Sequence, residues 1–535
     1  MRALALRRWP ELLTGLATLA FGLCVFGFGL VFRPLHNDEG VTLRVASHDS
    51  LSQVLDLAVN YRHGPPLHYA LVHASLLWRQ DLLGLRLPSA ALGVACVLLA
   101  YGFGRELLGR PGAALVAVTV ASSPVVVHLS QFARGYTAML AAGFLSLWLL
   151  LLLTRTRRAR WIAPYGASAV LLAAAHPFGL LALLSELVLL VVLGMGPQLR
   201  SRQWRALLLP GLAVVSAAAA LIALRQVYAP LQSKYGAGEG SAVVDPLGGR
   251  FWKALWQAWS GSSREWWWLV LAAVALAGLI VLWRRDRRAG LVCTVWLGVP
   301  LVLLSVLSAS SSDFAPERHL SFLLPAYAVC LAGAVLELSR RAGPWAAAGA
   351  MVVLLAPGVV AIAGDVGNFS SDLRDAGVRL AASMRPGDVL LTTGGRSEPG
   401  VDSRLYGSHA VLDAPDGTPL GRWAEVDAAA GCALADKLRV RPTPDAAWLL
   451  VRPPDPDRAV QALAGRGASP AVALGEFVLA RLPVPDHSVA GALEAGAQAY
   501  RALAREAGPA ADFARLARQY RLAATYEASG LCDGG

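Results

Sequence analysis

The sequence is poor in charged residues. Only 16% of its 535 residues are charged, whereas a typical soluble domain has about 25%. Hydrophobic residues make up 56% of the chain, and its mean hydropathy is +0.50. This composition excludes one long soluble protein with a water-facing surface. It also excludes a disordered chain, which requires low hydrophobicity and high charge. The chain is therefore interpreted first as a membrane protein.

Cysteine is scarce as well, with six residues in the whole chain. Four of them fall in apolar stretches, where a cysteine is usually a small buried hydrophobic residue: Cys24, Cys96, Cys293 and Cys330. The other two, Cys432 and Cys532, could pair in an oxidising compartment or remain two thiols, and the sequence leaves both readings open. The sequence has no internal repeat, no low-complexity tract and no nucleotide-sugar signature. A cleavable signal peptide is not expected either, because the first apolar stretch is too long for one.

Long apolar runs are what the sequence has in abundance. About 20 apolar residues in a helix cross the hydrocarbon core of a bilayer. Eleven stretches meet that test, at about 11–32, 87–108, 112–130, 136–153, 161–176, 178–195, 206–224, 266–283, 290–308, 319–338 and 344–363. The sequence therefore predicts an α-helical polytopic membrane protein with about eleven transmembrane helices.

Arginine residues are concentrated in every second gap between these spans. The N-terminus and every even-numbered gap are rich in arginine, as at Arg7 and Arg8, Arg105 and Arg110, Arg155 to Arg160, Arg200 to Arg205, Arg284 to Arg288, and Arg340 and Arg341. Arginine-rich loops face the cytoplasm. The formal net charge of +12 is thus mainly a topology signal, so no nucleic-acid partner is predicted. An odd number of spans then leaves the C-terminus on the outer side of the membrane.

One apolar segment, Pro65–Trp78, does not fit this alternation as a span. It has only about 14 residues, and counting it as a span would invert every later loop. We expect it to be an interfacial helix within the first outer loop, residues 33–86. Residues 1–364 would then form the transmembrane domain.

The remainder, residues 365–535, lacks long apolar runs and gains proline and aspartate. Strand-like stretches at 388–393, 446–451 and 476–482 alternate with helix-like stretches at 372–384 and 491–505. About 170 residues suffice for a folded domain. We expect an extracytoplasmic α/β domain here.

The predicted outer loops carry the polar residues suited to chemistry. The first loop opens with Asn37-Asp38-Glu39, and adjacent carboxylates at a membrane surface are costly unless solvated, paired or used. If a helix begins here, its dipole stabilises negative charge in the first turn. The pair could therefore also be explained structurally, as an N-cap followed by an acid in the first turn. The other candidates from the outer loops, which would suit an anionic lipid headgroup, are His63, Arg134, Lys234, Tyr235, Arg318 and His319.

These pieces, taken in order, resemble a known family. The matching motifs are Asn37-Asp38-Glu39, His63-Gly64-Pro65-Pro66-Leu67-His68-Tyr69, Arg86-Leu87-Pro88-Ser89-Ala90, Ser130-Gln131-Phe132-Ala133-Arg134-Gly135-Tyr136 and Pro316-Glu317-Arg318-His319. Together they resemble GT-C glycosyltransferases that use polyprenyl-phosphate sugars, in particular bacterial relatives of protein O-mannosyltransferases and of the lipid A aminoarabinose transferase. The chain departs from many relatives at Gly64, which intervenes after His63.

The resemblance implies a catalytic first loop and a sugar donor linked to polyprenyl phosphate. Such a donor has a good leaving group, so the enzyme needs a base for the acceptor and cations for the departing phosphate. Asp38 is implied as the base and Glu39 as its support. Arg134, Lys234 and Arg318 are the expected phosphate cations, with His63 and His319 as weaker ones and Tyr235 as a further substrate contact. A single direct displacement would invert the anomeric carbon.

No metal site is predicted, although Asp38, Glu39 and His63 would hold a divalent cation if they converged. Their spacing has no fixed metal signature, so no cofactor is assigned. Glu186 lies within a predicted span, where an acid marks function by default. We expect instead a protonated carboxyl bonded to a neighbouring helix.

Several functions remain open from the sequence. The acceptor could be a lipid, a glycan or a protein. One rival is a transferase that moves a whole glycan en bloc from a polyprenyl carrier. A second is a transporter of lipid-linked sugars, although transporters usually place binding groups near the midplane of two related halves. A third is a non-catalytic scaffold for polysaccharide export.

Overall fold

The computed structural model describes most of the chain in two compact units. The described residues are 20, 22–23, 26–27, 30, 37–61, 66–194, 252, 255, 259, 267–307, 316–367, 379, 383, 388–392, 424–427, 444–451, 453–474, 477–507 and 513–529. The helical unit consists of residues 1–31, 48–75 and 84–367, and the C-terminal unit consists of residues 32–47, 76–83 and 368–535. Each unit is described by itself below.

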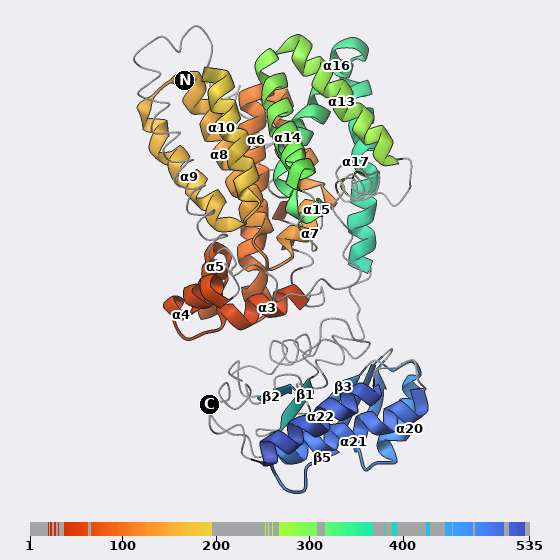
Figure 1. Cartoon of the computed structure of the whole chain (residues 1–535). Coiled ribbons are helices and arrows are strands. Elements are labelled where there is room, and N and C mark those ends of the chain that lie inside the picture. Colours follow the sequence, from red (N-terminus) through yellow and green to blue (C-terminus); the bar gives the residue numbers. More distant parts are fainter. Residues whose placement is uncertain are drawn as a thin grey trace. The chain divides into compact units, whose positions relative to one another are not determined.

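The helical unit begins with short elements and continues with long apolar helices (Figure 1). The short ones are α4 (Leu51–Asp56), the π-helical turn η1 (Leu57–Tyr61) and α5 (Pro66–Trp78), whose last residues belong to the other unit. The long and connecting ones are α6 (Leu82–Ala121), α7 (Pro124–Ser130), α8 (Tyr136–Thr156), η2 (Ala159–Trp161), α9 (Ile162–Ala175), α10 (Gly179–Gly194), α13 (Trp267–Arg285), α14 (Arg287–Leu307), α15 (Pro316–His319), η5 (Ser321–Leu323), α16 (Leu324–Ala342) and α17 (Pro344–Gly367).

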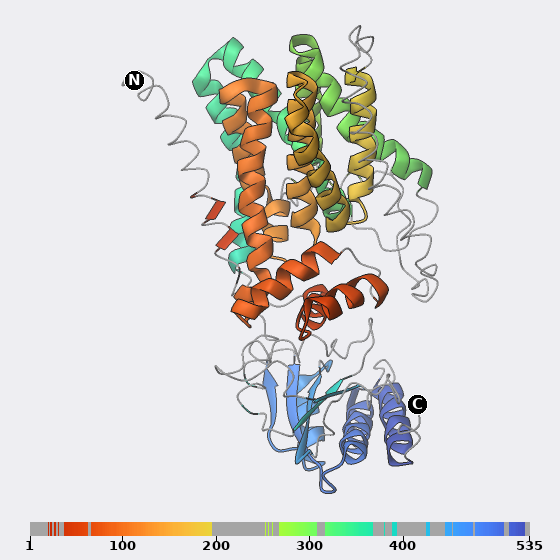
Figure 2. The same ribbon diagram turned by 90° about the vertical axis from the view of Figure 1, so that its left-hand side faces the viewer.

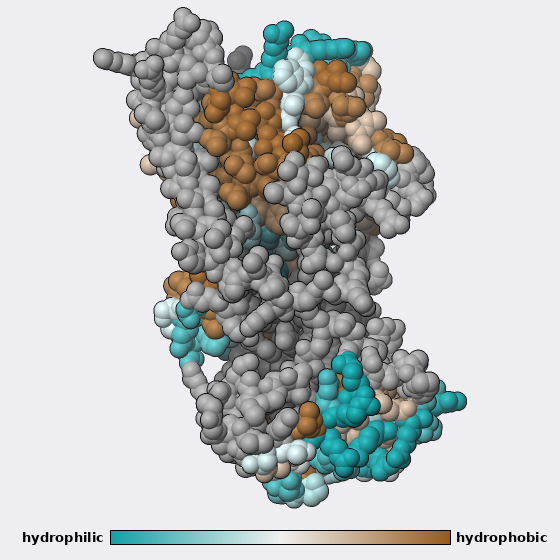
Figure 3. Space-filling model, in the orientation of Figure 1, coloured by the Kyte–Doolittle hydropathy of each residue, from teal (hydrophilic) through white to brown (hydrophobic). Residues whose placement is uncertain are grey.

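Five of the described segments are long and apolar enough to cross a membrane, namely Leu82–Ala121, Tyr136–Thr156, Trp267–Arg285, Ser321–Ala342 and Pro344–Ala363. Gly179–Leu193 is a shorter apolar helix. Apolar side chains gather on the side of the unit that Figure 3 shows. On α17, Trp345 is 87% exposed and Val360 69% exposed. Contiguous exposed apolar surface of this kind is typical of a face covered by lipid.

The described helices correspond to predicted spans, with the main difference at α6 and α7. The predicted spans at 87–108 and 112–130 correspond to α6 and α7 together. Helix α6 is kinked at Gly109, where φ is 72°, and its apolar run ends at Ala121 before Pro124 opens α7. Helix α9 agrees with the predicted stretch at 161–176 to within one residue at each end, although its 14 residues are fewer than the roughly 20 that cross a bilayer. The predicted span at 206–224 and most of 11–32 lie outside the described residues.

Buried polar groups tie the helices together at two levels. At the arginine-rich ends, Glu106 of α6 pairs with Arg155 of α8 at 3.0 Å and lies 3.8 Å from Arg288 of α14. Deeper in the bundle, Ser146 of α8 and Tyr165 of α9 both donate hydrogen bonds to Glu186 Oε2 of α10, at 2.9 and 3.0 Å. The expectation that Glu186 bonds to neighbouring helices is thus matched, by two helices rather than one.

The C-terminal unit contains α3 (Asn37–Ala46) and a five-stranded sheet in the order β2-β1-β3-β5-β4. Its strands are β1 (Val389–Thr392), β2 (Ala424–Asp427), β3 (Ala446–Val451), β4 (Ala471–Leu474) and β5 (Phe477–Pro483). Strands β2, β1 and β3 are parallel to one another, and β5 is antiparallel to β3 and β4. Strands β1, β3 and β5 correspond to the three strand-like stretches of the sequence.

Three helices accompany this sheet, namely α20 (Pro456–Ala464), α21 (Val489–Ala507) and α22 (Phe513–Ala528). Helix α21 contacts β1, β3 and β5, and α22 packs along α21 (Figure 2). Their buried residues form one hydrophobic core with the sheet, in which Tyr500 and Tyr520 are almost fully buried. The predicted helix at 491–505 is α21, and most of the predicted helix at 372–384 lies outside the described residues.

We expect Glu186→Ala to destabilise the helical unit. The substitution leaves the buried hydroxyls of Ser146 and Tyr165 without their shared acceptor, and each unsatisfied group costs about 1–3 kcal/mol. Glu186→Gln keeps an acceptor oxygen and serves as the matched control, with a smaller loss. Thermal unfolding of the purified protein measures both. An alanine variant that unfolds at the wild-type temperature would show that this contact contributes nothing.

Candidate functional site

A cluster of aromatic and histidine side chains lies where four segments of the helical unit end. Its members are Phe132, which follows α7, Tyr136 at the start of α8, His176 and Phe178 in the α9–α10 turn, and His319 at the end of α15. We call these five residues the outer cluster, because all of them fall in predicted outer loops or at the ends of spans that face outward. Two of them that are in contact, Tyr136 and His319, are 183 residues apart in sequence.

The rings of the outer cluster are in mutual contact. Phe178 stacks on His319 with ring centroids 4.7 Å apart and an interplanar angle of 13°. Tyr136 lies 4.9 Å from the His176 ring, and its hydroxyl is 3.4 Å from His319 Nε2. The two imidazoles are 5.7 Å apart. The cluster thus presents hydrogen-bonding groups held between aromatic faces.

A close backbone approach at Gly135 brings α8 against the end of α9. A Cβ atom at this position would lie 2.5 Å from the carbonyl oxygen of Ala175, so any larger residue would push the two helices apart. The residues on either side, Arg134 and Tyr136, are thereby placed beside His176. Glycine at 135 is therefore a geometric requirement of the cluster and not a neutral part of the motif.

Arg134 supplies positive charge at the edge of this cluster. Its guanidinium donates a long hydrogen bond of 3.5 Å to the hydroxyl of Tyr69 on α5. Burial lowers the pKa of His176 well below its usual value, and the positive charges of His319 and Arg134 lower it further. His176 is therefore neutral at pH 7. Arg134 remains the charged group, while His176 offers a hydrogen bond without charge.

The predicted site residues are only partly described. Arg134, Arg318 and His319 lie in the helical unit, and His319 belongs to the outer cluster. Asp38 and Glu39 lie in the first turn of α3, as the sequence predicts, and the Glu39 side chain is buried. This helix belongs to the C-terminal unit. His63, Lys234 and Tyr235 lie outside the described residues.

Of the outer cluster, sequence reasoning named only His319 as a site residue, and Phe132 and Tyr136 lay in a family motif without an assigned role. His176 and Phe178 were visible only as a short outer turn, His176-Pro177-Phe178, for which helix capping was a sufficient explanation. Tyr69 lies in a family motif, but nothing in its spacing pointed to Arg134. In the part of the chain that the structure describes, no three His, Cys, Asp or Glu side chains gather in a way that could hold a metal ion.

The described geometry predicts acid sensitivity through His176. Its folded-state pKa is lowered, so the unfolded chain binds the proton more readily. The stabilisation is complete above about pH 6.5, the unfolded value, and is lost as the pH falls toward the folded value. We expect the thermal midpoint to drop between pH 7 and pH 5, and His176→Gln to flatten that dependence. An equally steep dependence in the variant would exclude His176 as its source.

Comparison with known proteins gives a likeness of fold. No family model matches the sequence, and no curated protein sequence matches it either. Among solved structures, ArnT from Cupriavidus metallidurans in the apo state is similar with a TM-score of 0.55 and 14% identity over 89% of this chain and 98% of that one. The same protein bound to undecaprenyl phosphate gives a TM-score of 0.53, with 14% identity over 88% of this chain and 98% of that one.

The archaeal oligosaccharyltransferase AglB from Archaeoglobus fulgidus, in complex with an inhibitory peptide and a dolichol-phosphate, is similar with a TM-score of 0.50. The identity is 11%, over 83% of this chain and 69% of that one. ArnT and AglB both have the GT-C fold. The resemblance to GT-C glycosyltransferases that the sequence motifs carry is therefore confirmed at the level of fold.

Proposed function

We propose that this chain is an integral membrane glycosyltransferase that moves a sugar from a polyprenyl-phosphate donor to a lipid, glycan or protein acceptor. The observation that carries the proposal is the outer cluster with Arg134 at its edge, within a fold shared with ArnT bound to undecaprenyl phosphate. A lipid phosphate needs a fixed cation and hydrogen-bond donors at the membrane surface. Arg134, the Tyr136 hydroxyl and His319 are groups of that kind.

The two ends of the bundle support the orientation inferred from charge. Glu106, Arg155 and Arg288 meet at one set of helix ends, and all three come from predicted cytoplasmic ends. Arg134, His176 and His319 gather from predicted outer ends. In our proposal the transferase domain is residues 1–364, with about eleven spans in the bacterial inner membrane. Residues 365–535 form the extracytoplasmic α/β domain.

The reaction would proceed by one direct displacement. Asp38 takes the proton of the acceptor hydroxyl or amine while the acceptor atom attacks the anomeric carbon. The bond from that carbon to the phosphate oxygen breaks on the opposite face, which inverts the configuration. The phosphate leaves with the electron pair and is stabilised by Arg134, Arg318 and Lys234. Glu39 orients the base, whereas His63, Tyr235 and His319 contact the substrate.

An en bloc glycan transferase is the second candidate, because AglB shares the fold. The likeness covers 98% of the ArnT structure and 69% of that AglB structure. A transporter of lipid-linked sugars is less well supported. The charged groups of the site come from outer helix ends, whereas transporters bind near the midplane.

Mass spectrometry of surface lipids and glycoproteins tests the proposal. Cells that carry Asp38→Asn should lose one sugar mass that wild-type cells have, since loss of a general base slows transfer by about 10²- to 10⁴-fold. The matched control is Asp457→Asn, an exposed carboxylate of α20, which should leave the glycans unchanged. If no glycan changes in cells that make folded Asp38→Asn protein, the chain is not a transferase that uses this base.

A second test separates donor binding from the chemical step. Arg134→Ala should raise the KM for the polyprenyl-linked donor by about tenfold or more, because a charge-assisted hydrogen bond to phosphate is lost. Arg158→Ala, an exposed arginine at the opposite helix ends, is the control. Steady-state transfer in proteoliposomes measures both, and an unchanged KM in Arg134→Ala would remove this residue from the phosphate site.

A further inference from the structure

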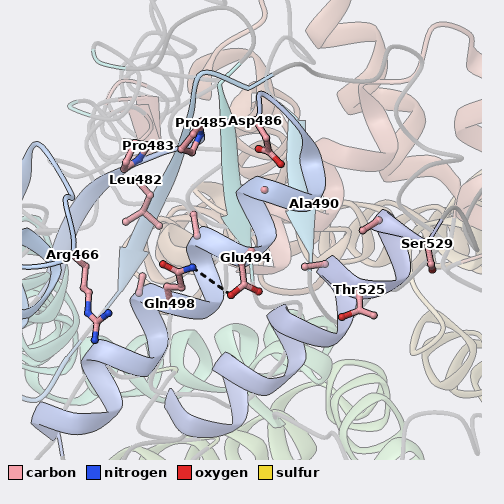
Figure 4. A pocket seen from close by; sticks show the side chains of 15 residues that line it. Arg466, Leu482, Pro483, Pro485, Asp486, Ala490, Glu494, Gln498, Thr525 and Ser529 are labelled. Carbon is pink, nitrogen blue, oxygen red and sulfur yellow. Dashed lines mark hydrogen bonds between the residues drawn. The ribbon is translucent and has the colours of Figure 1, made fainter.

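A pocket of about 870 Å³ opens in the C-terminal unit, between α21, α22 and the end of β5 (Figure 4). Its volume is within the range of roughly 300–1,000 Å³ that is usual for small-molecule sites. No residue of the transferase site proposed above lines it. The pocket therefore needs an explanation of its own.

The pocket exists because side chains fill the space between α21 and α22 at one end of the pair and not at the other. Near one end of the pair, Tyr500 lies between Tyr520 and Phe513, with ring centroids 5.2 and 6.0 Å away, and these rings close the space between the helices. Toward the other end no aromatic ring lines the gap, and small residues such as Ala495 and Ala528 leave it open. The helices stay together while a hollow remains between them.

One wall of the pocket is a fixed carboxylate, Asp486. It accepts hydrogen bonds from the hydroxyl and the backbone N–H of Ser488, at 2.6 and 3.3 Å. These bonds lower the pKa of Asp486, so it is ionised at neutral pH. The carboxylate lies over the first turn of α21 only because residue 491 is glycine, since a Cβ there would overlap Asp486 Oδ1.

The next two turns of α21 add a second carboxylate and an amide. Glu494 Oε1 accepts a hydrogen bond of 2.7 Å from Arg501 and a longer one of 3.4 Å from Gln498. Both side chains line the pocket, and among the described residues no bond is made to Glu494 Oε2 or to the Gln498 carbonyl oxygen, so each can accept a further hydrogen bond (Figure 4). The hydroxyl of Thr525 lines the wall that α22 provides.

Arg466 brings donors to the same pocket. It comes from the turn between α20 and β4, and its guanidinium has no ion pair or hydrogen bond within the described part of the chain. The lining thus combines acceptors at Asp486 and Glu494, donors at Arg466, and groups of both kinds at Gln498 and Thr525. Small apolar residues form the remaining surface.

This combination restricts the chemistry of the occupant. Arg501 pairs with Glu494, and Arg466 balances Asp486, so the lining carries little net charge and favours neither an anion nor a cation. Its charged groups disfavour an apolar ligand. A cation would find acceptors but would be repelled by Arg466 and would leave its donors unused. A neutral ligand that is dense in hydroxyl groups uses both kinds, because each hydroxyl donates once and accepts twice. We propose that this pocket is a binding site for a neutral saccharide.

The proposal goes beyond the transferase activity and does not depend on it. Saccharide binding in the C-terminal unit is an equilibrium property that is measured without a donor and without transfer. An inactive protein that binds saccharides here would leave the proposal standing, and an active one that binds none here would overturn it.

The test uses the full-length protein in phospholipid nanodiscs, free of sugar-based detergent. Maltotriose, cellotriose and mannotriose are the probes, and saturation-transfer NMR with titration gives the affinity. We expect millimolar binding of at least one probe, weakened about tenfold or more by Glu494→Ala and by Gln498→Ala. Ala528→Trp fills the pocket without removing a polar group and should abolish binding. Glu506→Ala, an exposed carboxylate at the other end of α21, is the matched control and should bind as wild type does.

Three outcomes would overturn the proposal. The first is that no trisaccharide binds to the folded wild-type protein. The second is binding that survives all three pocket substitutions, which would locate the saccharide elsewhere. The third is that a trilysine peptide, and no saccharide, binds with sensitivity to Glu494→Ala. If Glu494→Ala fails to fold because it loses the contact with Arg501, Gln498→Ala and Ala528→Trp still decide the question.

Discussion

The helical unit depends on one constraint, which is that backbone polar groups in a lipid environment must be satisfied within the chain. Helices meet that requirement along their length and fail to meet it at their ends. The described breaks at Ser122–Pro124, Gln131–Gly135 and His176–Phe178 are where the backbone leaves the helical pattern. The outer cluster lies at two of these breaks and at the end of α15, where side chains with hydrogen-bonding groups are compatible with the requirement.

The relative positions of the side chains in the outer cluster depend on helix contacts deeper in the bundle. Ser146, Tyr165 and Glu186 lie 10, 11 and 8 residues from Tyr136, His176 and Phe178 along their respective helices. At about 1.5 Å per residue, this hydrogen-bonded set lies about 12–16 Å from the cluster on all three helices. Together with the close approach at Gly135, it holds α8, α9 and α10 in register. A polar set within the bundle thus supports a polar site at its edge.

The sequence predicted those features of the fold that depend on residues close together along the chain. Hydropathy located α8, α10, α13 and α16 well, and the alternation of arginine indicated which helix ends belong together, as the Glu106, Arg155 and Arg288 contacts then illustrate. The break before Pro124 was missed because apolar residues resume at Val125, although Ser122, Ser123 and Pro124 interrupt the run.

The site was less predictable because it is assembled from distant segments. Arg134 and His319 were expected from motifs, and the structure describes both at the outer ends of the helices. The contact of His319 with Phe178 and His176 joins loops about 140 residues apart, and no spacing in the sequence encodes it. The lowered pKa of His176 is a result of that packing. The pocket between α21 and α22 likewise follows from which end of the pair carries the tyrosines.

Photocrosslinking tests the central claim, that the outer cluster receives the donor phosphate, most directly. A polyprenyl phosphate with a photoreactive group near its phosphate would be added to the full-length protein in nanodiscs, and the labelled peptides would be identified by mass spectrometry. The account predicts labelling of peptides that contain residues 128–136, 176–178 and 316–319, with competition by unlabelled polyprenyl phosphate. Competed labelling confined to the arginine-rich ends, at 155–160 and 284–288, would contradict it.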